Sequence, residues 1–77
     1  MKNTRRWEKE IRQIGPNIKR IRLEKGLNKP ELVRSLGVTP RVWNDWESGR
    51  KTPSLPHLIG IANALGTSLD DLIPRIR

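Results

Sequence analysis

Residues 28–49, NKPELVRSLGVTPRVWNDWESG, contain the start signals of two helices with a glycine between them. Asn28 and Thr39 are residue types that cap a helix N-terminus, and Pro40 suits the first helical position. Gly37 lies where a left-handed residue would end the first helix and turn the chain sharply. The stretch therefore predicts one helix that begins after Asn28 and a second over 40–48, joined by a tight turn.

Local contacts reinforce both helix starts. Glu31 lies three residues after Asn28 and can bond back to its amide, which makes a capping box. Leu27 and Val38 directly precede the two caps and can pack against apolar side chains one turn inside each helix. Such well-made ends matter in a small domain, whose single core is marginal.

Helix signals recur along the rest of the chain, and strand signals do not. Residues 16–25 place isoleucines at a helical interval, and 54–65 carry an apolar stripe at i, i+3, i+4 and i+7. Ser68, with Asp71 three residues later, resembles a second capping box, which predicts a short last helix that Pro74 ends. The sequence thus predicts an all-α chain of five short helices.

The N-terminal residues allow two interpretations. Trp7, Ile11 and Ile14 can share one helical stripe, which indicates an extra N-terminal helix. The alternative is a mobile basic arm. We expect a partly ordered helix, because a large aromatic residue is unusual in a purely flexible arm. The expected organisation is an arm or short helix over 1–13 and one domain over 14–77.

Composition restricts the classes of function. The 77 residues include 16 basic and 8 acidic side chains, a net charge of +8, and no cysteine. Disulfides, thiol catalysis and cysteine-based zinc sites are therefore excluded. No apolar run approaches the roughly 20 residues of a membrane span. A chain this basic has a polyanion as its default partner.

The positive charge is unevenly distributed. Residues 1–25 contain nine basic and three acidic side chains, whereas residues 54–73 contain two aspartates and no lysine or arginine. We expect one end of the fold to face the polyanion and the other to face away from it. Two helices, a glycine turn and a basic surface are typical of a helix-turn-helix, which places one helix in the DNA major groove.

The chain resembles the Cro/CI-type (XRE-like) helix-turn-helix family of phage repressors and bacterial regulators over about four-fifths of its length. The matching residues are Ile14-Gly15, Ile18, Ile21-Arg22, Gly26-Leu27, Glu31-Leu32, Leu36-Gly37-Val38-Thr39, Trp43, Trp46-Glu47, Ser48-Gly49, Pro53, Leu58, Ala62, Leu65-Gly66 and Ser68-Leu69-Asp70-Asp71-Leu72. The resemblance implies a compact five-helix lambda-repressor-like domain that binds double-stranded DNA, usually as a homodimer on a two-fold operator.

The chain departs from the family pattern at several positions. Lys29 replaces a common glutamine that fixes the protein to a backbone phosphate, and Val33 replaces a small alanine. Pro40 stands where many relatives carry a base-reading polar residue. Trp43 and Trp46 occupy aliphatic positions of the recognition helix, and we expect both to be structural.

Helical periodicity divides the 40–48 helix into two faces. Trp43, Trp46 and Glu47 lie at i, i+3 and i+4 and should face inward. The residues left to read bases are Arg41, Val42, Asn44 and Asp45. Phosphate contacts are expected from both ends of the motif, from Asn28, Lys29, Thr39, Ser48, Arg50, Lys51 and Thr52, with Lys19, Lys2, Arg5 and Arg6 as weaker candidates.

Each base-reading side chain suits a particular base edge. Arg41 can bond guanine O6 and N7 together, or else contact a phosphate. Asn44 can pair with adenine, and Val42 can touch a thymine methyl group. Asp45 can accept from cytosine N4, or it can hold Arg41 one helical turn earlier.

Arg22 and Glu47 form a pair that the family commonly makes between the first helix and the end of the recognition helix. Both fall on inward stripes. We expect a partly buried salt bridge that locks the recognition helix at its angle.

The main hypothesis is a small dimeric repressor that occludes a promoter, working in the cytoplasm at the nucleoid. Dimerisation is expected at the charge-poor C-terminal end, around Leu69, Leu72, Ile73 and Ile76. No residue pattern suggests an enzyme, a cofactor or a small-molecule substrate, and His57 has no metal-ligand spacing with other side chains.

Two competing hypotheses come from other classes of protein. An antitoxin-like or adaptor module would bind a protein partner at the apolar C-terminal surface, with DNA binding secondary. Alternatively, residues 2–14 could form a basic helix on a membrane surface. Glu8, Glu10 and the small number of apolar anchors argue against the membrane role, so no membrane partner is expected.

Overall fold

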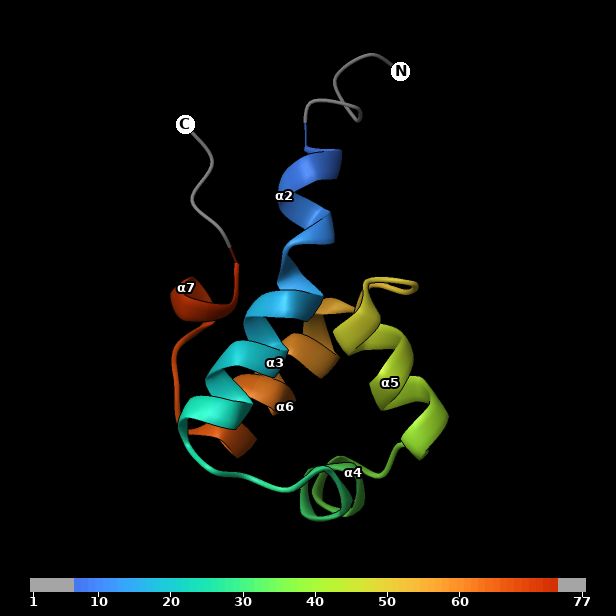
Figure 1. The fold of residues 1–77 in the computed structure, drawn as a ribbon, viewed down its shortest axis with the longest axis vertical. Helices are drawn as coiled ribbons and strands as arrows, with labels where there is room; N and C mark the ends of the chain where they lie inside the picture. Colours follow the sequence, from blue (N-terminus) through green and yellow to red (C-terminus); the bar gives the residue numbers. More distant parts are fainter. Residues whose placement is uncertain (1–6, 74–77) are drawn as a thin grey trace.

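The computed structural model describes residues 7–73, and within them every regular element is a helix (Figure 1). In chain order the helices are α2 (Glu8–Arg12), α3 (Ile14–Glu24), α4 (Lys29–Leu36), α5 (Pro40–Ser48), α6 (Leu55–Leu65) and α7 (Leu69–Leu72). The all-α prediction is confirmed: α3 to α7 are the five expected helices, and α2 precedes them.

One core joins these helices. The buried apolar side chains come from α3, α4, α5, α6 and α7, and they are Ile14, Ile18, Ile21, Leu32, Val33, Trp43, Trp46, Leu58, Ile61, Ala62, Leu65 and Leu72. Trp43 is the largest side chain that is completely buried. The two tryptophans of the 40–48 helix are therefore structural, as expected.

Helix α3 begins earlier than the sequence indicated, at Ile14 rather than residue 16. Gly15 and Pro16 look like breaks in a sequence, but both lie in the first turn of α3, where proline is tolerated because its missing N–H has no helical partner. Helix α2 projects from the N-terminal end of α3, away from the other helices (Figure 1). Of the proposed stripe, Ile14 is buried, whereas Trp7 and Ile11 are 38% and 40% exposed.

Side chains cap the starts of α5, α6 and α7. The side chains of Thr39, Ser54 and Ser68 accept hydrogen bonds from backbone N–H groups in the first turns of α5, α6 and α7. Gly37 has a φ of 68° and makes the left-handed turn between α4 and α5. Asn28 has the extended conformation of a cap, but its side chain makes no capping hydrogen bond. The prediction of a capping box between Asn28 and Glu31 is therefore wrong.

The last helix, α7, is bonded to α3, because Asn17 Nδ2 donates to the Leu72 carbonyl oxygen at 3.2 Å.

Within residues 7–73, no helix has the length and apolar character needed to cross a membrane.

Candidate nucleic-acid interface

Helix α5 is held against α3 by unusually close backbone packing. A Cβ atom built on Gly15 would lie 2.0 Å from the Trp46 carbonyl oxygen, so only glycine permits this approach. Trp43 and Trp46 meet edge to face with ring centroids 5.9 Å apart, and the His57 ring lies 5.0 Å from that of Trp46. These contacts fix the inner face of α5 and leave its outer face free to meet a partner.

A buried ion pair crosses the same contact. Arg22 Nε donates to Glu47 Oε2 at 2.7 Å, and Arg22 Nη2 donates to Oε1 at 3.4 Å. Both side chains are less than a tenth exposed. Arg22 Nη1 also donates to the Leu27 carbonyl oxygen at 3.1 Å, so the guanidinium joins α3, the α3–α4 loop and α5. The salt bridge expected from the sequence is thus present, and it is more fully buried than expected.

The outer face of α5 presents side chains in three different states. Arg41 is exposed in the first turn and makes no hydrogen bond or ion pair with any residue from 7 to 73. Val42 is partly buried against the core. Asn44 is exposed, and its Oδ1 accepts a hydrogen bond from Lys29 Nζ at 3.1 Å. Arg41 is therefore the side chain most available for a new contact.

Asp45 pairs with a different arginine from the one that the sequence suggested. The sequence allows Asp45 either to hold Arg41 or to accept from a cytosine. The Asp45 carboxylate lies 4.0 Å from Arg50 Nε instead of pairing with Arg41, and the Asp45 side chain is only 13% exposed. Its contact with a cytosine stays a prediction. Its backbone carbonyl oxygen accepts from Ser48 Oγ and from the Lys51 amide. Asp45 thus organises the loop that follows α5.

The expected phosphate-binding residues lie at the two ends of the motif. Asn28 and Lys29 open α4, and Thr39 caps α5 by accepting from the Val42 amide at 3.1 Å. Ser48 ends α5 and accepts from the Arg50 amide at 3.4 Å. Arg50, Lys51 and Thr52 are exposed in the following loop. The structure therefore places the predicted phosphate-binding residues at the start of α4, at the start of α5 and in the loop after α5, and their contact with phosphate stays a prediction.

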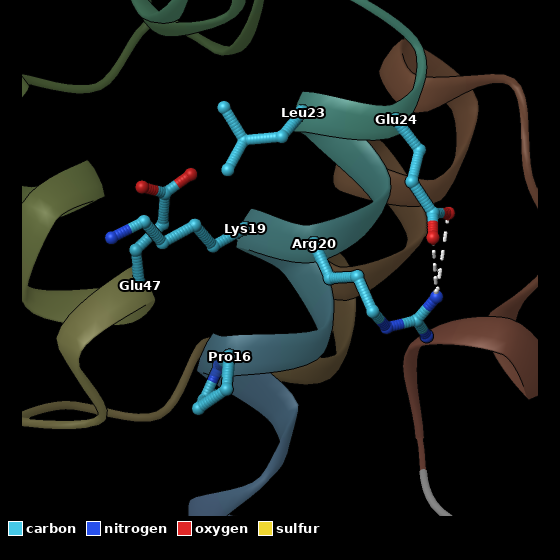
Figure 2. A pocket seen from close by; sticks show the side chains of 6 residues that line it. All are labelled: Pro16, Lys19, Arg20, Leu23, Glu24 and Glu47. Carbon is cyan, nitrogen blue, oxygen red and sulfur yellow. Dashed lines mark hydrogen bonds and ion pairs between the residues drawn. The ribbon is translucent and has the colours of Figure 1, made fainter.

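Lys19 of α3 lies closer to this surface than the sequence indicated. A hollow of about 250 Å³ is lined by Lys19, Lys29, Asn44, Glu47 and Ser48, which come from three helices. Figure 2 shows the Lys19 side chain extending toward Glu47, while Arg20 and Glu24 lie on the other side of α3. Sequence reasoning ranked Lys19 as a weak candidate because its position beside α5 depends on how α3 and α5 cross.

A wider groove of about 530 Å³ lies along α3, and its lining residues are drawn in Figure 2. Leu23 contributes an apolar surface that is 58% exposed, flanked by charged side chains. Arg20 Nη1 donates to both carboxylate oxygens of Glu24 at 3.3 Å.

No group of three potential metal ligands occurs among residues 7–73.

The C-terminal residues require one correction. Leu72 was expected at a dimer interface, but it is fully buried in the core of its own chain and has no surface to offer a partner. Leu69 and Ile73 pack against the core and remain partly exposed. Ile76 lies outside the described residues. The sequence alone could not distinguish a core residue from an interface residue here, because apolar side chains are found in both environments.

Comparisons with known proteins show which family and fold the chain resembles. A family model described as helix-turn-helix matches residues 18–72. A protein of Sinorhizobium fredii named as the uncharacterized HTH-type transcriptional regulator y4dJ is 35% identical over 60 residues, covering 78% of each chain. The crystal structure of the clp gene regulator ClgR from C. glutamicum superposes with a TM-score of 0.75 at 32% identity, covering 80% of this chain and 82% of that one.

A third relative has a different name. Multiprotein-bridging factor 1 of Candida glabrata is 36% identical over 56 residues, which is 73% of this chain but only 37% of that protein. The similarity therefore concerns one part of that longer protein. The family model covers most of the present chain, and the Sinorhizobium relative matches along most of its length, so the chain belongs to the Cro/CI-type (XRE-like) helix-turn-helix family of transcriptional regulators.

Proposed function

We propose that this chain is a sequence-specific regulator that binds double-stranded DNA by inserting α5 into the major groove, and that it works as a small dimeric repressor. The observation that carries the proposal is Arg41. It stands in the first turn of α5, exposed and without a partner among residues 7–73, on a helix whose inner face is immobilised by Gly15 and Glu47. The first turn is where recognition helices approach base edges most closely.

Base selection in this proposal rests on few side chains. Arg41 bonds guanine O6 and N7, a contact worth roughly 1–3 kcal/mol of discrimination. Val42 offers its exposed edge to a thymine methyl group, and Asn44 reads a neighbouring base. Asp45 acts mainly through Arg50, because binding a cytosine would require that ion pair to open.

Phosphate contacts supply most of the affinity. Lys29 and the α4 N-terminus face one strand, and Ser48, Arg50, Lys51 and Thr52 face the other. If about six phosphates are neutralised, the logarithm of the binding constant falls with the logarithm of salt concentration at a slope of about −5. The dimer would form at the charge-poor end through Leu69, Ile73 and residues beyond the described part of the chain. Bound over a promoter, it would repress by occlusion.

Selection from a random double-stranded DNA pool at roughly physiological salt tests the proposal. We expect an enriched palindrome whose half-sites are about one helical turn apart. Arg41→Ala should relax the choice of base at one position in each half-site and weaken binding there by about tenfold or more. Arg20→Ala is the matched control, because Arg20 is an exposed arginine of α3 whose side chain extends away from Glu47 of α5 (Figure 2).

Binding without any enriched sequence would contradict the proposal. It would favour the second candidate, an antitoxin-like or adaptor module, which draws support from the relative named as a multiprotein-bridging factor. In that case the basic surface would provide backbone affinity only, and a stable complex with a protein partner would be the next measurement.

A further inference from the structure

The contact between Lys29 and Asn44 fixes which way the Asn44 amide faces. Lys29 Nζ lies 3.1 Å from the Asn44 side chain. An ammonium group only donates hydrogen bonds, so the amide atom facing it must be the carbonyl oxygen, Oδ1. The amide nitrogen, Nδ2, then points away from Lys29, and it has no partner among residues 7–73. Asn44 therefore presents its N–H donors to whatever approaches α5.

The Lys29 ammonium is itself held in place. It lies 3.7 Å from Glu47 Oε1, and the Glu47 carboxylate is anchored by the buried Arg22 guanidinium. The Lys29 side chain is 42% exposed, so one of its three N–H groups remains available to an external acceptor. A chain of contacts thus runs from the core at Arg22, through Glu47 and Lys29, to the exposed amide of Asn44.

We propose that Lys29 is a positioning residue that makes Asn44 select guanine rather than adenine. This inference rests on the proposed DNA-binding function and refines the role of Asn44 in it. Asparagine reads adenine by accepting from the N6 amino group while donating to N7. In this protein Asn44 Oδ1 already accepts from the Lys29 ammonium. If Oδ1 also met the N6 amino group of adenine, the positive ammonium would lie beside a second hydrogen-bond donor, which disfavours adenine.

Guanine fits the same pair of side chains better. Its major-groove edge carries two neighbouring acceptors, N7 and O6, whereas adenine offers one acceptor and one donor. Asn44 and Lys29 together present donors only, so Nδ2 can donate to one guanine acceptor while the ammonium attracts the other. Cytosine, whose N4 amino group is a donor, should be the least favoured base at this position.

The test measures binding of four operators that differ only at the position read by Asn44, at one salt concentration. That position is the one where Asn44→Ala abolishes the base preference. The protein with Lys29 should prefer guanine over adenine there by about tenfold. Lys29→Met should remove or reverse this preference, while the base read by Arg41 stays unchanged. Lys19→Met is the control, because Lys19 lines the same hollow but makes no hydrogen bond to Asn44.

Two results would overturn the inference. One is a preference for adenine at the Asn44 position in the unmodified protein. The other is a Lys29→Met variant that weakens all four operators equally, since Lys29 would then act only as a phosphate contact. Failure to enrich any operator would instead refute the proposed function itself. Without DNA, Lys29→Met should shift the NMR resonances of the Asn44 side-chain amide, and unchanged resonances would also refute the inference.

Discussion

The contact of α5 with α3 and the contact of α4 with α6 are built in different ways. At the first, Gly15 lies against the Trp46 carbonyl oxygen, and the buried Arg22–Glu47 pair joins the same two helices. At the second, the nearest atom to a Cβ built on Gly60 is Cδ2 of the Leu36 side chain, at 2.8 Å. The α3–α5 contact therefore depends on backbone atoms and a buried ion pair, whereas the α4–α6 contact depends on a side chain that can change conformation.

This difference has a consequence for recognition. A backbone carbonyl cannot turn aside, so the approach of α3 and α5 has a single tolerated geometry. A leucine side chain can change rotamer, so α4 and α6 can adjust to small changes. The helix that presents Arg41 is therefore positioned by the stiffer of the two contacts, which suits the base-reading role proposed for Arg41.

The largest expected effect comes from breaking the buried ion pair. Glu47→Ala leaves the Arg22 guanidinium buried with only the Leu27 carbonyl oxygen as an acceptor. Removing one partner of a buried pair typically costs about 3–5 kcal/mol, a large part of the stability of a small domain. Urea unfolding of the two proteins, followed by tryptophan fluorescence, measures the difference.

Glu24→Ala is the control for this variant. It removes an equivalent glutamate whose pair with Arg20 is more than half exposed, so it should cost less than about 1 kcal/mol. Equal losses from the two variants would show that the buried pair does not hold α3 and α5 together.

The second-largest expected effect is the loss of stability from replacing Gly15, which we compare with the same replacement at Gly60. Gly15→Ala must displace α5, because the new Cβ would meet backbone at 2.0 Å, and we expect a loss of about 3 kcal/mol. Gly60→Ala meets only the end of Leu36 and gains about 0.5–1 kcal/mol of helix propensity, so its net effect should be within about 1 kcal/mol of zero. Thermal and urea unfolding of both variants provide the measurement.

A double-variant cycle sharpens this comparison. Combining Gly60→Ala with Leu36→Ala removes the atom that the new Cβ meets, so any cost of the first substitution should disappear in the second background. No side-chain truncation should rescue Gly15→Ala, since its closest neighbours are backbone atoms. If Gly15→Ala were as mild as Gly60→Ala, the two contacts would not differ in stiffness.

The sequence predicted the features that depend on neighbouring residues, and it missed those that depend on contacts between residues far apart in the chain. The bounds of α5 were predicted correctly, because Thr39, Pro40 and Gly49 signal them locally. The start of α3 was missed, because Gly15 is placed there by a contact with α5 that lies far along the chain. Helical periodicity correctly placed Trp43, Trp46 and Glu47 on the inner face.

Among the side-chain pairs around the candidate site, the sequence predicted the Arg22–Glu47 pair but not the partners of Asp45 and Asn44. Asp45 and Arg41 are one helical turn apart, which suggested a pair, yet the loop after α5 brings Arg50 to Asp45 instead. Lys29 and Asn44 are 15 residues apart, and their contact exists only because α4 and α5 cross where they do. Periodicity identifies the face of a helix, whereas the partner of a side chain depends on the three-dimensional arrangement.

The smallest expected effect concerns α7, which is attached through the buried Leu72 side chain and the hydrogen bond from Asn17 to the Leu72 carbonyl oxygen. Asp71 accepts hydrogen bonds from Thr67 Oγ1 at 2.6 Å, from Ser68 Oγ and from the Ser68 amide. The Thr67 hydroxyl, followed by the Ser68 groups, lowers the pKa of Asp71 below its ordinary value of 3.8. Because the folded protein favours the ionised form, this contribution is fully present above pH 3.8 and is lost as the pH falls through the lower folded value.

Asp71→Asn should therefore lower the melting temperature slightly near neutral pH, and the difference from the unmodified protein should shrink as the pH is brought below 3.8. Hydrogen exchange at the amides of α7 should show the same trend, because the capping box stabilises the first turn of this helix. Asp70→Asn is the control, since Asp70 is exposed in the same turn and makes no hydrogen bond within residues 7–73. A deficit that stays constant down to the lowest pH would show that the Asp71 charge is unimportant. The contact of α7 would then depend on the packing of Leu69 and Leu72 and on the Asn17 amide.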